Sequence, residues 1–116
     1  LDATSSYGVW LEGAGRLSKC VIESNRHGGV FIAHQGRPRV TECTIARNGN
    51  AGVTTGEKSE GLVQRNTIEY NHGFGLRLRQ GCGTHHLQNT VRFNKEGGML
   101  GERACGGLVA ENTFAE

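Results

Sequence analysis

Short runs in which apolar residues alternate with variable ones occur along the whole chain. In the first run the aliphatic residues Val9 and Leu11 flank Trp10. Alternation with a period of two is typical of a strand that buries one of its faces. We therefore expect a short, half-buried strand here and at each place where the run returns. It returns at residues 30–32, 53–55, 76–78 and 99–101.

Four rows of similar residues share a period of 23 and extend this pattern to a repeat. An aliphatic residue precedes the Cys/Asn row by three positions at Leu17, Val40 and Val63, and an apolar row follows it by two. These two positions predict a second short alternating run in each unit. The rows are Asn25, Asn48, Asn71 and Asn94; Gly29, Gly52, Gly75 and Gly98; Cys20, Cys43, Asn66, Asn89 and Asn112; and Ile22, Ile45, Ile68, Val91 and Phe114.

The repeat predicts the fold. Strands this short cannot bury their apolar faces alone, but coils stacked about 4.8 Å apart enclose a continuous core. The sequence thus predicts an all-β, single-stranded parallel β-helix with about five coils of 23 residues. Right-handed coils are expected because parallel crossovers take that hand.

The predicted domain organisation is simple. Residues 1–7 lead into the repeat, and residues 8–116 form the β-helix. Neither end carries an amphipathic cap of the kind that terminal coils need, so we expect this to be part of a longer β-helix, or a chain whose ends contact something else. The first coil is shorter than the rest, since Gly8 and Gly29 are 21 residues apart. The missing residues fall between Glu12 and Leu17, which places them in a variable turn.

The asparagines are predicted to be structural. Identical residues one coil apart lie above one another, so their side-chain amides can form hydrogen bonds along a ladder. Asparagine also tolerates the left-handed conformation of turns, and we expect both properties to be used. The first ladder contains Asn25, Asn48, Asn71 and Asn94, and the second contains Asn66, Asn89 and Asn112.

Composition excludes several other classes of protein. The 116 residues include 19 glycines and one proline, and a glycine costs about 1 kcal/mol relative to alanine inside a helix. A helix bundle is therefore excluded. A pI near 8.5 is only mildly basic and does not indicate nucleic-acid binding, and no apolar run is long enough for a membrane span. Asp2 is the only aspartate, which disfavours the calcium and sugar-cleaving sites that use aspartate clusters.

Two segments resemble a known repeat family. They read GGVFIAHQGRPRVTECTIARNGNAGV and GLVQRNTIEYNHGFGLRL, and they resemble β-helix repeats of the CASH (carbohydrate-binding and sugar-hydrolase) type. The period of 23 is most similar to the β-helix of F-box substrate receptors in cullin-based ubiquitin ligases. The resemblance covers residues 8–114 and implies a recognition surface. The same pattern occurs in bacterial polysaccharide-active proteins, and no F-box is present in this sequence.

The cysteines form two pairs one period apart, Cys20 with Cys43 and Cys82 with Cys105. Stacking places each pair within the Cα range of a disulfide, yet buried free cysteine also behaves as a small apolar residue. Free thiols are favoured over disulfides, and zinc is disfavoured because the pairs lie at different corners. Free thiols predict an intracellular protein, whereas disulfides would indicate a secreted one.

His85 and His86 interrupt the apolar pattern. His86 stands where other coils have a residue such as Val63. The favoured interpretation is a buried neutral histidine with one hydrogen-bond partner. A local register shift that turns Leu87 inward is the alternative.

The outward face of the first strand of each coil is the candidate binding face. Glu12 and Glu102 lie four coils apart, about 19 Å, whereas the two carboxyl groups of a glycosidase lie roughly 5–10 Å apart. Exposed aromatic and arginine side chains on this face are typical of protein interfaces. The predicted face consists of Trp10, Glu12, Phe31, Arg77, Arg79 and Glu102.

These observations predict a non-catalytic recognition module for a protein partner. The alternative is a fragment of a polysaccharide lyase, hydrolase or epimerase whose catalytic coils lie elsewhere. A polysaccharide partner remains open, a nucleic acid is disfavoured by the small basic patch of Arg77 and Arg79, and no cofactor or metal is expected.

Overall fold

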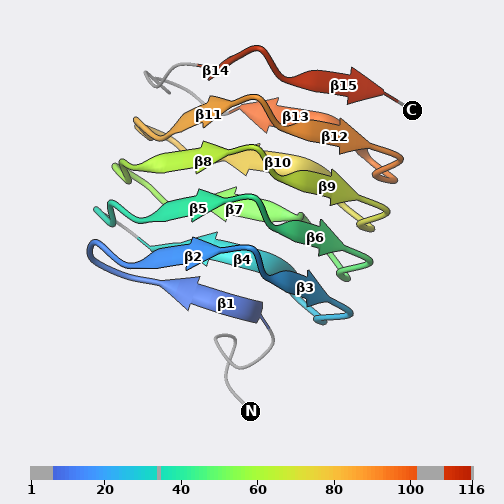
Figure 1. Ribbon diagram of the computed structural model, residues 1–116, viewed down its shortest axis with the longest axis horizontal. Coiled ribbons are helices and arrows are strands. Elements are labelled where there is room, and N and C mark those ends of the chain that lie inside the picture. The colour runs from blue at the N-terminus through green and yellow to red at the C-terminus, as the bar shows by residue number, and fades with distance from the viewer. Residues whose placement is uncertain (1–6, 34, 102–108, 116) are drawn as a thin grey trace.

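A computed structural model of the chain shows a stack of parallel strands (Figure 1) and describes residues 7–33, 35–101 and 109–115. Within these residues, three parallel sheets contain five strands each. We call them sheets A, B and C, in the order in which the chain passes through them. The fold is therefore a parallel β-helix, as the repeat predicts.

The strand bounds are as follows. Sheet A contains β1 (Tyr7–Leu11), β4 (Gly28–Ile32), β7 (Val53–Thr55), β10 (Phe74–Leu78) and β13 (Gly97–Gly101). Sheet B contains β2 (Arg16–Ser18), β5 (Arg39–Thr41), β8 (Leu62–Gln64), β11 (His85–Leu87) and β14 (Val109–Ala110). Sheet C contains β3 (Val21–Glu23), β6 (Thr44–Ala46), β9 (Thr67–Glu69), β12 (Thr90–Arg92) and β15 (Thr113–Ala115).

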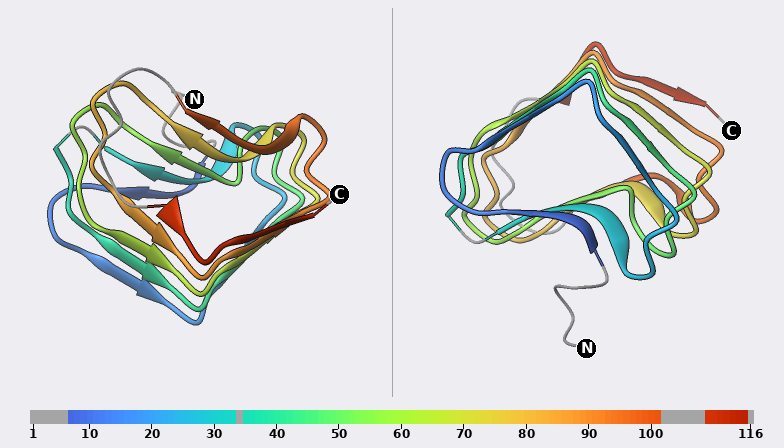
Figure 2. Two further views of the ribbon diagram at one scale, coloured as in Figure 1. Left: turned by 90° about the horizontal axis from the view of Figure 1, so that it is seen from above. Right: turned by 60° about the horizontal axis from the view of Figure 1, so that its bottom comes forward.

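The pairing register follows the sequence period. Val30 pairs with Val53, 23 positions later, whereas Val9 pairs with Val30 at a spacing of 21. The spacing of 23 is restored between Leu17 and Val40 in sheet B. The turn between β1 and β2 thus absorbs the short first coil, as predicted. Seen from above, successive coils lie over one another (Figure 2).

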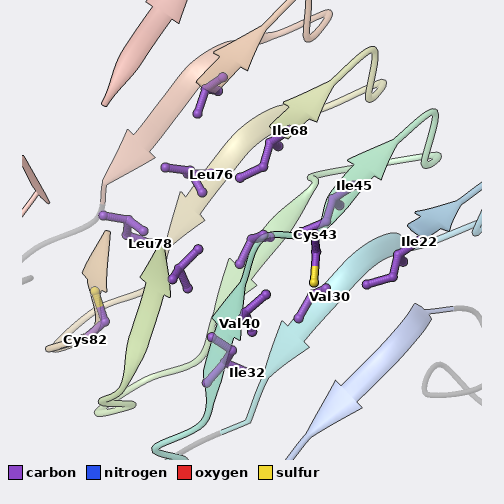
Figure 3. Close-up of a cluster of buried hydrophobic side chains, with 13 residues drawn as sticks. Ile22, Val30, Ile32, Val40, Cys43, Ile45, Ile68, Leu76, Leu78 and Cys82 are labelled. Atoms are coloured by element: carbon purple, nitrogen blue, oxygen red, sulfur yellow. The ribbon is translucent and has the colours of Figure 1, made fainter. Parts of the chain in front are cut away.

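The core is a column of aliphatic side chains inside the coils. Ile45 and Ile68 are completely buried, and so are Val40 and Val63. Figure 3 shows Ile22, Ile45 and Ile68 on successive coils, pointing into the interior. One residue on each side of these positions points outward, so the period-two pattern of the sequence corresponds to real inward and outward faces.

The glycine row is explained by close approach between the coils. A Cβ atom on Gly52 would lie 2.5 Å from Cγ2 of Ile68 and 2.8 Å from Nδ2 of Asn71. Real side chains do not approach so closely, which leaves glycine as the residue that fits. The row therefore marks where the strand of sheet A packs against the isoleucine row and the asparagine ladder.

The corners on either side of sheet C have a left-handed backbone at one residue in each coil. The residue is the one before each ladder position, for example Arg65 at φ 57° and Arg47 at φ 56°. None of the described asparagines has a positive φ. The expectation that the asparagines themselves take the left-handed conformation is therefore wrong. Their side chains must point inward to form the ladder, so the bend falls on the preceding, outward residue.

The first asparagine ladder has the predicted hydrogen bonds. Oδ1 of Asn71 accepts from the backbone nitrogen and Nδ2 of Asn48, at 3.0 and 2.9 Å. Nδ2 of Asn71 donates to Oδ1 of Asn94 and to the Ile45 carbonyl oxygen, at 2.9 and 3.2 Å. The same bonds begin at Asn25. Each inner amide thus makes four hydrogen bonds, which accounts for its burial.

The second ladder contains both asparagine and cysteine. Oδ1 of Asn89 accepts from the backbone nitrogen and Nδ2 of Asn66, each at 3.0 Å. Asn89 then donates to Oδ1 of Asn112 at 2.9 Å. Cys43 occupies the next position down, where its thiol lies 3.3 Å from the Thr41 carbonyl oxygen. Cys20 and Cys43 are free thiols, and burial raises the pKa of the Cys43 thiol. Cys105 lies outside the described residues.

His86 is buried in the core, which confirms the favoured interpretation. It pairs with Val63 and Val109 without a register shift. Its Nδ1 donates to the Thr84 carbonyl oxygen at 3.1 Å. Burial lowers the pKa of His86 to about 4, so the ring is neutral at pH 7.

Candidate recognition site

The outward row of sheet A differs in exposure from one coil to the next. Trp10 is 36% exposed and Leu100 39%, whereas Thr54 between them is only 7% exposed. Phe31 and Arg77 are half-buried. Exposure on this face is therefore greatest at its two ends, and the aromatic residues lie at the N-terminal end.

The aromatic residues form a stacked cluster. Because Trp10 pairs with Phe31 on the next strand, their rings lie 4.3 Å apart at an interplanar angle of 30°. Tyr7 at the start of β1 packs against both, with ring centroids 5.3 Å from Phe31 and 5.7 Å from Trp10. The parallel register thus converts two widely separated sequence positions into one rigid platform.

A groove of about 540 Å³ runs beside this platform. It lies where the strands of sheet A end and the turns to sheet B begin. Glu12 stands at its edge, and the Trp10 Nε1 donates a hydrogen bond to the Glu12 Oε1 at 3.0 Å. The lining consists of Trp10, Glu12, Gly13, Phe31, Ala33, Gly56, Glu57 and Arg79.

The structure brings four of the six predicted face residues into this groove: Trp10, Glu12, Phe31 and Arg79. Arg77 lies outside the groove lining, in the middle of β10 beside Thr54 and Leu100. Glu102 lies outside the described residues. The groove therefore contains mainly the N-terminal residues of the predicted face.

Glu57 is a groove residue that the sequence reasoning missed. It is exposed in the turn after β7, one position beyond Gly56. The strand rows do not include Glu57, so they did not predict it. Its position directly after Gly56, which belongs to the same row as Glu12 and Arg79, would have indicated it. Glu57 stands two coils from Glu12, about 10 Å along the axis, with Arg79 one coil further on. The groove therefore presents charges of both signs next to an apolar platform.

Comparison with protein families agrees with this architecture. The family model described as a right handed beta helix region matches residues 1–116. The chain belongs to this right-handed β-helix family. The match confirms the predicted hand and fold but does not distinguish F-box receptors from other members. A search of curated proteins and a search of solved structures each found no match.

Two further observations concern other kinds of site in this β-helix. The described residues contain no helix long and apolar enough to cross a membrane. Within the same residues, no three histidine, cysteine or acidic side chains gather as a metal site would require.

Proposed function

We propose that this β-helix is a non-catalytic recognition module that binds a protein partner through the groove beside Trp10 and Phe31. The observation that carries the proposal is the stack of the exposed Trp10 ring on the half-buried Phe31 ring, 4.3 Å between centroids, at the edge of a groove with charged walls. Aromatic and arginine residues dominate the binding energy of protein interfaces. The groove combines both types on a rigid sheet.

The rigidity of the platform favours binding. Phe31 lies on β4, which is hydrogen-bonded on both sides by β1 and β7. Ordering side chains on binding costs about 0.5–1.5 kcal/mol for each mobile group. Rings that already stack on one another lose less freedom. The platform is therefore suited to a central position in an interface, with Glu12, Glu57 and Arg79 at its polar edge.

A second candidate function is polysaccharide binding or cleavage in the same groove. It is favoured by one observation, the two carboxylates Glu12 and Glu57 beside Arg79 and an aromatic platform. Sugar rings stack on aromatic faces, and glycosidases use two carboxyl groups on opposite sides of the bond. Their backbones lie two coils apart, about 10 Å along the axis at about 4.8 Å per coil. This is the upper limit of the roughly 5–10 Å between the two carboxyl groups of a glycosidase, so protein binding ranks first.

We also propose an intracellular location. It is supported by the free thiols of Cys20 and Cys43, which lie on adjacent coils without forming a disulfide. Stacked thiols in an oxidising compartment would be expected to pair.

The test compares how substitutions in the groove and a substitution of an aromatic residue outside it affect binding of the partner. Partner proteins captured from a cell lysate by the wild type are identified and purified, and the affinity of one is measured by calorimetry. Phe31→Ala and Arg79→Ala should each weaken binding at least fivefold. Phe93→Ala, at an exposed ring on another corner, should leave the affinity unchanged.

The same proteins are assayed on an acidic polysaccharide. Turnover that is lost in Glu57→Gln would overturn the non-catalytic proposal and establish the second one. Equal weakening by Phe31→Ala and Phe93→Ala would show that the partner does not use the groove.

A further inference from the structure

Two arginines lie side by side on the outer face of sheet B, away from the groove. Arg16 in β2 pairs in register with Arg39 in β5, and both side chains are exposed. Their strands are neighbours in the stack (Figure 1), so the two Cα atoms lie about 4.8 Å apart. Two positive charges thus share one small area of the surface.

This pair has no counter-ion within the described part of the chain. No described carboxylate forms an ion pair with Arg16 or Arg39, whereas the neighbouring Arg37 lies 3.4 Å from Glu60. Like charges directly opposite one another destabilise a sheet. On the other side, the corner residues Lys19 and Glu42 contribute one charge of each sign. The local excess of two positive charges therefore belongs to Arg16 and Arg39.

Two hydroxyl groups complete the arrangement. Ser18 and Thr41 stand two positions after the arginines on the same outward face and pair with each other. A residue and its second neighbour along a strand are about 6.6 Å apart. The four side chains surround a hollow of about 130 Å³, lined by Arg16, Ser18, Arg39 and Thr41.

We propose that this hollow, the sheet B pocket, binds a phosphate monoester carried by a protein partner. Two guanidinium groups match the charge of −1.5 to −2 that a phosphoserine carries near neutral pH. Each presents donors in a planar fork that fits phosphate oxygens, and the two hydroxyls donate to oxygens on the opposite side. The anion then removes the repulsion between the arginines.

The pattern of the outward row favours a single phosphate over a sulfated polysaccharide. The row that begins with Arg16 and Arg39 continues with Leu62, not with another arginine. A polymer with regularly spaced sulfates would be matched by a longer line of cations. A sulfate ester also carries one negative charge where the pocket offers two positive ones. This pocket is separate from the groove, so the two proposals fail independently.

The test measures binding of a phosphoserine tripeptide by NMR titration, with the unphosphorylated peptide as reference. Arg16→Gln and Arg39→Gln should each weaken binding at least tenfold. Arg26→Gln removes an exposed arginine at a different corner and should change the affinity less than twofold. Arg39→Lys, which keeps the charge but loses the fork, should also weaken binding clearly.

Folding is checked in the same samples. Because the arginines repel one another, Arg39→Gln should melt no lower than the wild type without peptide, and it should lose the stabilisation that the phosphopeptide gives. Equal affinity for the two peptides, or equal loss in Arg26→Gln, would overturn the proposal. Tighter binding of a sulfated oligosaccharide through the same two arginines would replace it with a polysaccharide site.

Discussion

His86 stands in a core row in which the neighbouring coils have valine. A histidine fits this apolar position as the neutral ring and not as the charged one. His86 is fully buried, and within the described residues its Nε2 has no hydrogen-bond partner. Burial lowers the pKa of His86 to about 4, and the Thr84 carbonyl oxygen offsets only part of this effect. The side chain therefore contributes shape and one hydrogen bond, and it makes the core sensitive to acid.

The pH dependence of His86 gives the first prediction. The unfolded chain has the ordinary histidine pKa of about 6.5, so it binds the proton first and gains stability relative to the folded state as pH falls. The contribution of neutral His86 is complete above pH 6.5 and is lost between pH 6.5 and about 4. The loss should be about 3 kcal/mol, at about 1.4 kcal/mol per pKa unit.

Denaturant unfolding at a series of pH values measures this loss. His86→Val, which matches the residue at position 63, should flatten the curve between pH 6.5 and 4. His72→Gln is the control, because His72 is exposed, and it should leave the curve unchanged. A wild-type slope that persists in His86→Val would assign the acid sensitivity to other groups.

At the scale of the element, the corners explain the period of the sequence. Most corners beside sheet C combine a left-handed residue with an inward amide, as at Tyr70 and Asn71, and Lys19 and Glu42 precede cysteines instead. The left-handed conformation is costly for a bulky residue such as tyrosine. The ladder hydrogen bonds on the next residue offset that cost. Corner and ladder thus depend on one another, and neither is stable in a single isolated coil.

Loss of a ladder amide gives the second prediction. Asn71→Ala removes the acceptor of two Asn48 donors and the donor to the Ile45 carbonyl oxygen. Buried polar groups left without partners cost about 1–3 kcal/mol each. Chemical denaturation should show a loss of at least 2 kcal/mol. Asn50→Ala, at an exposed turn asparagine, should cost less than about 0.5 kcal/mol. Similar losses for both variants would contradict a structural role for the ladder.

For the whole molecule, stability comes from stacking, since the pairing partners of every strand belong to the adjacent coils. The core side chains of the last described coil show this dependence. Met99 is 41% and Phe114 44% exposed, although Leu76 and Val91 in the same rows are completely buried. Whether a residue of these rows is buried therefore depends on the coils stacked on either side of it and not on the residue type.

The cysteines give the third prediction, which belongs to this scale because Cys20 and Cys43 lie on adjacent coils and are free thiols. Thiol titration of the unfolded, unreduced protein should find four thiols, and the double variant Cys20→Ser, Cys43→Ser should have two. Two thiols in the wild type and two in the variant would indicate a disulfide between Cys20 and Cys43 and would remove the support for an intracellular location.

Residue spacing was sufficient to predict the coil, its period and its inward residues. Rows such as Ile45 and Ile68 repeat at a fixed interval, and the backbone pairs only with adjacent coils, so a local pattern is sufficient to define the fold. The short first coil and the buried His86 were also predictable, because each is a departure from a row.

The way in which side chains of different coils combine could be seen only in the folded chain. Glu57 lines the groove although it belongs to no strand row. Arg77 does not line it, although its row predicted that it would belong to the binding face. The left-handed corners fell on the residues before the asparagines. These features depend on turn geometry and on side-chain packing between coils, which residue spacing does not specify. The pairing of Arg16 with Arg39 follows from the period, but the hollow between their side chains appears only when the two coils are stacked.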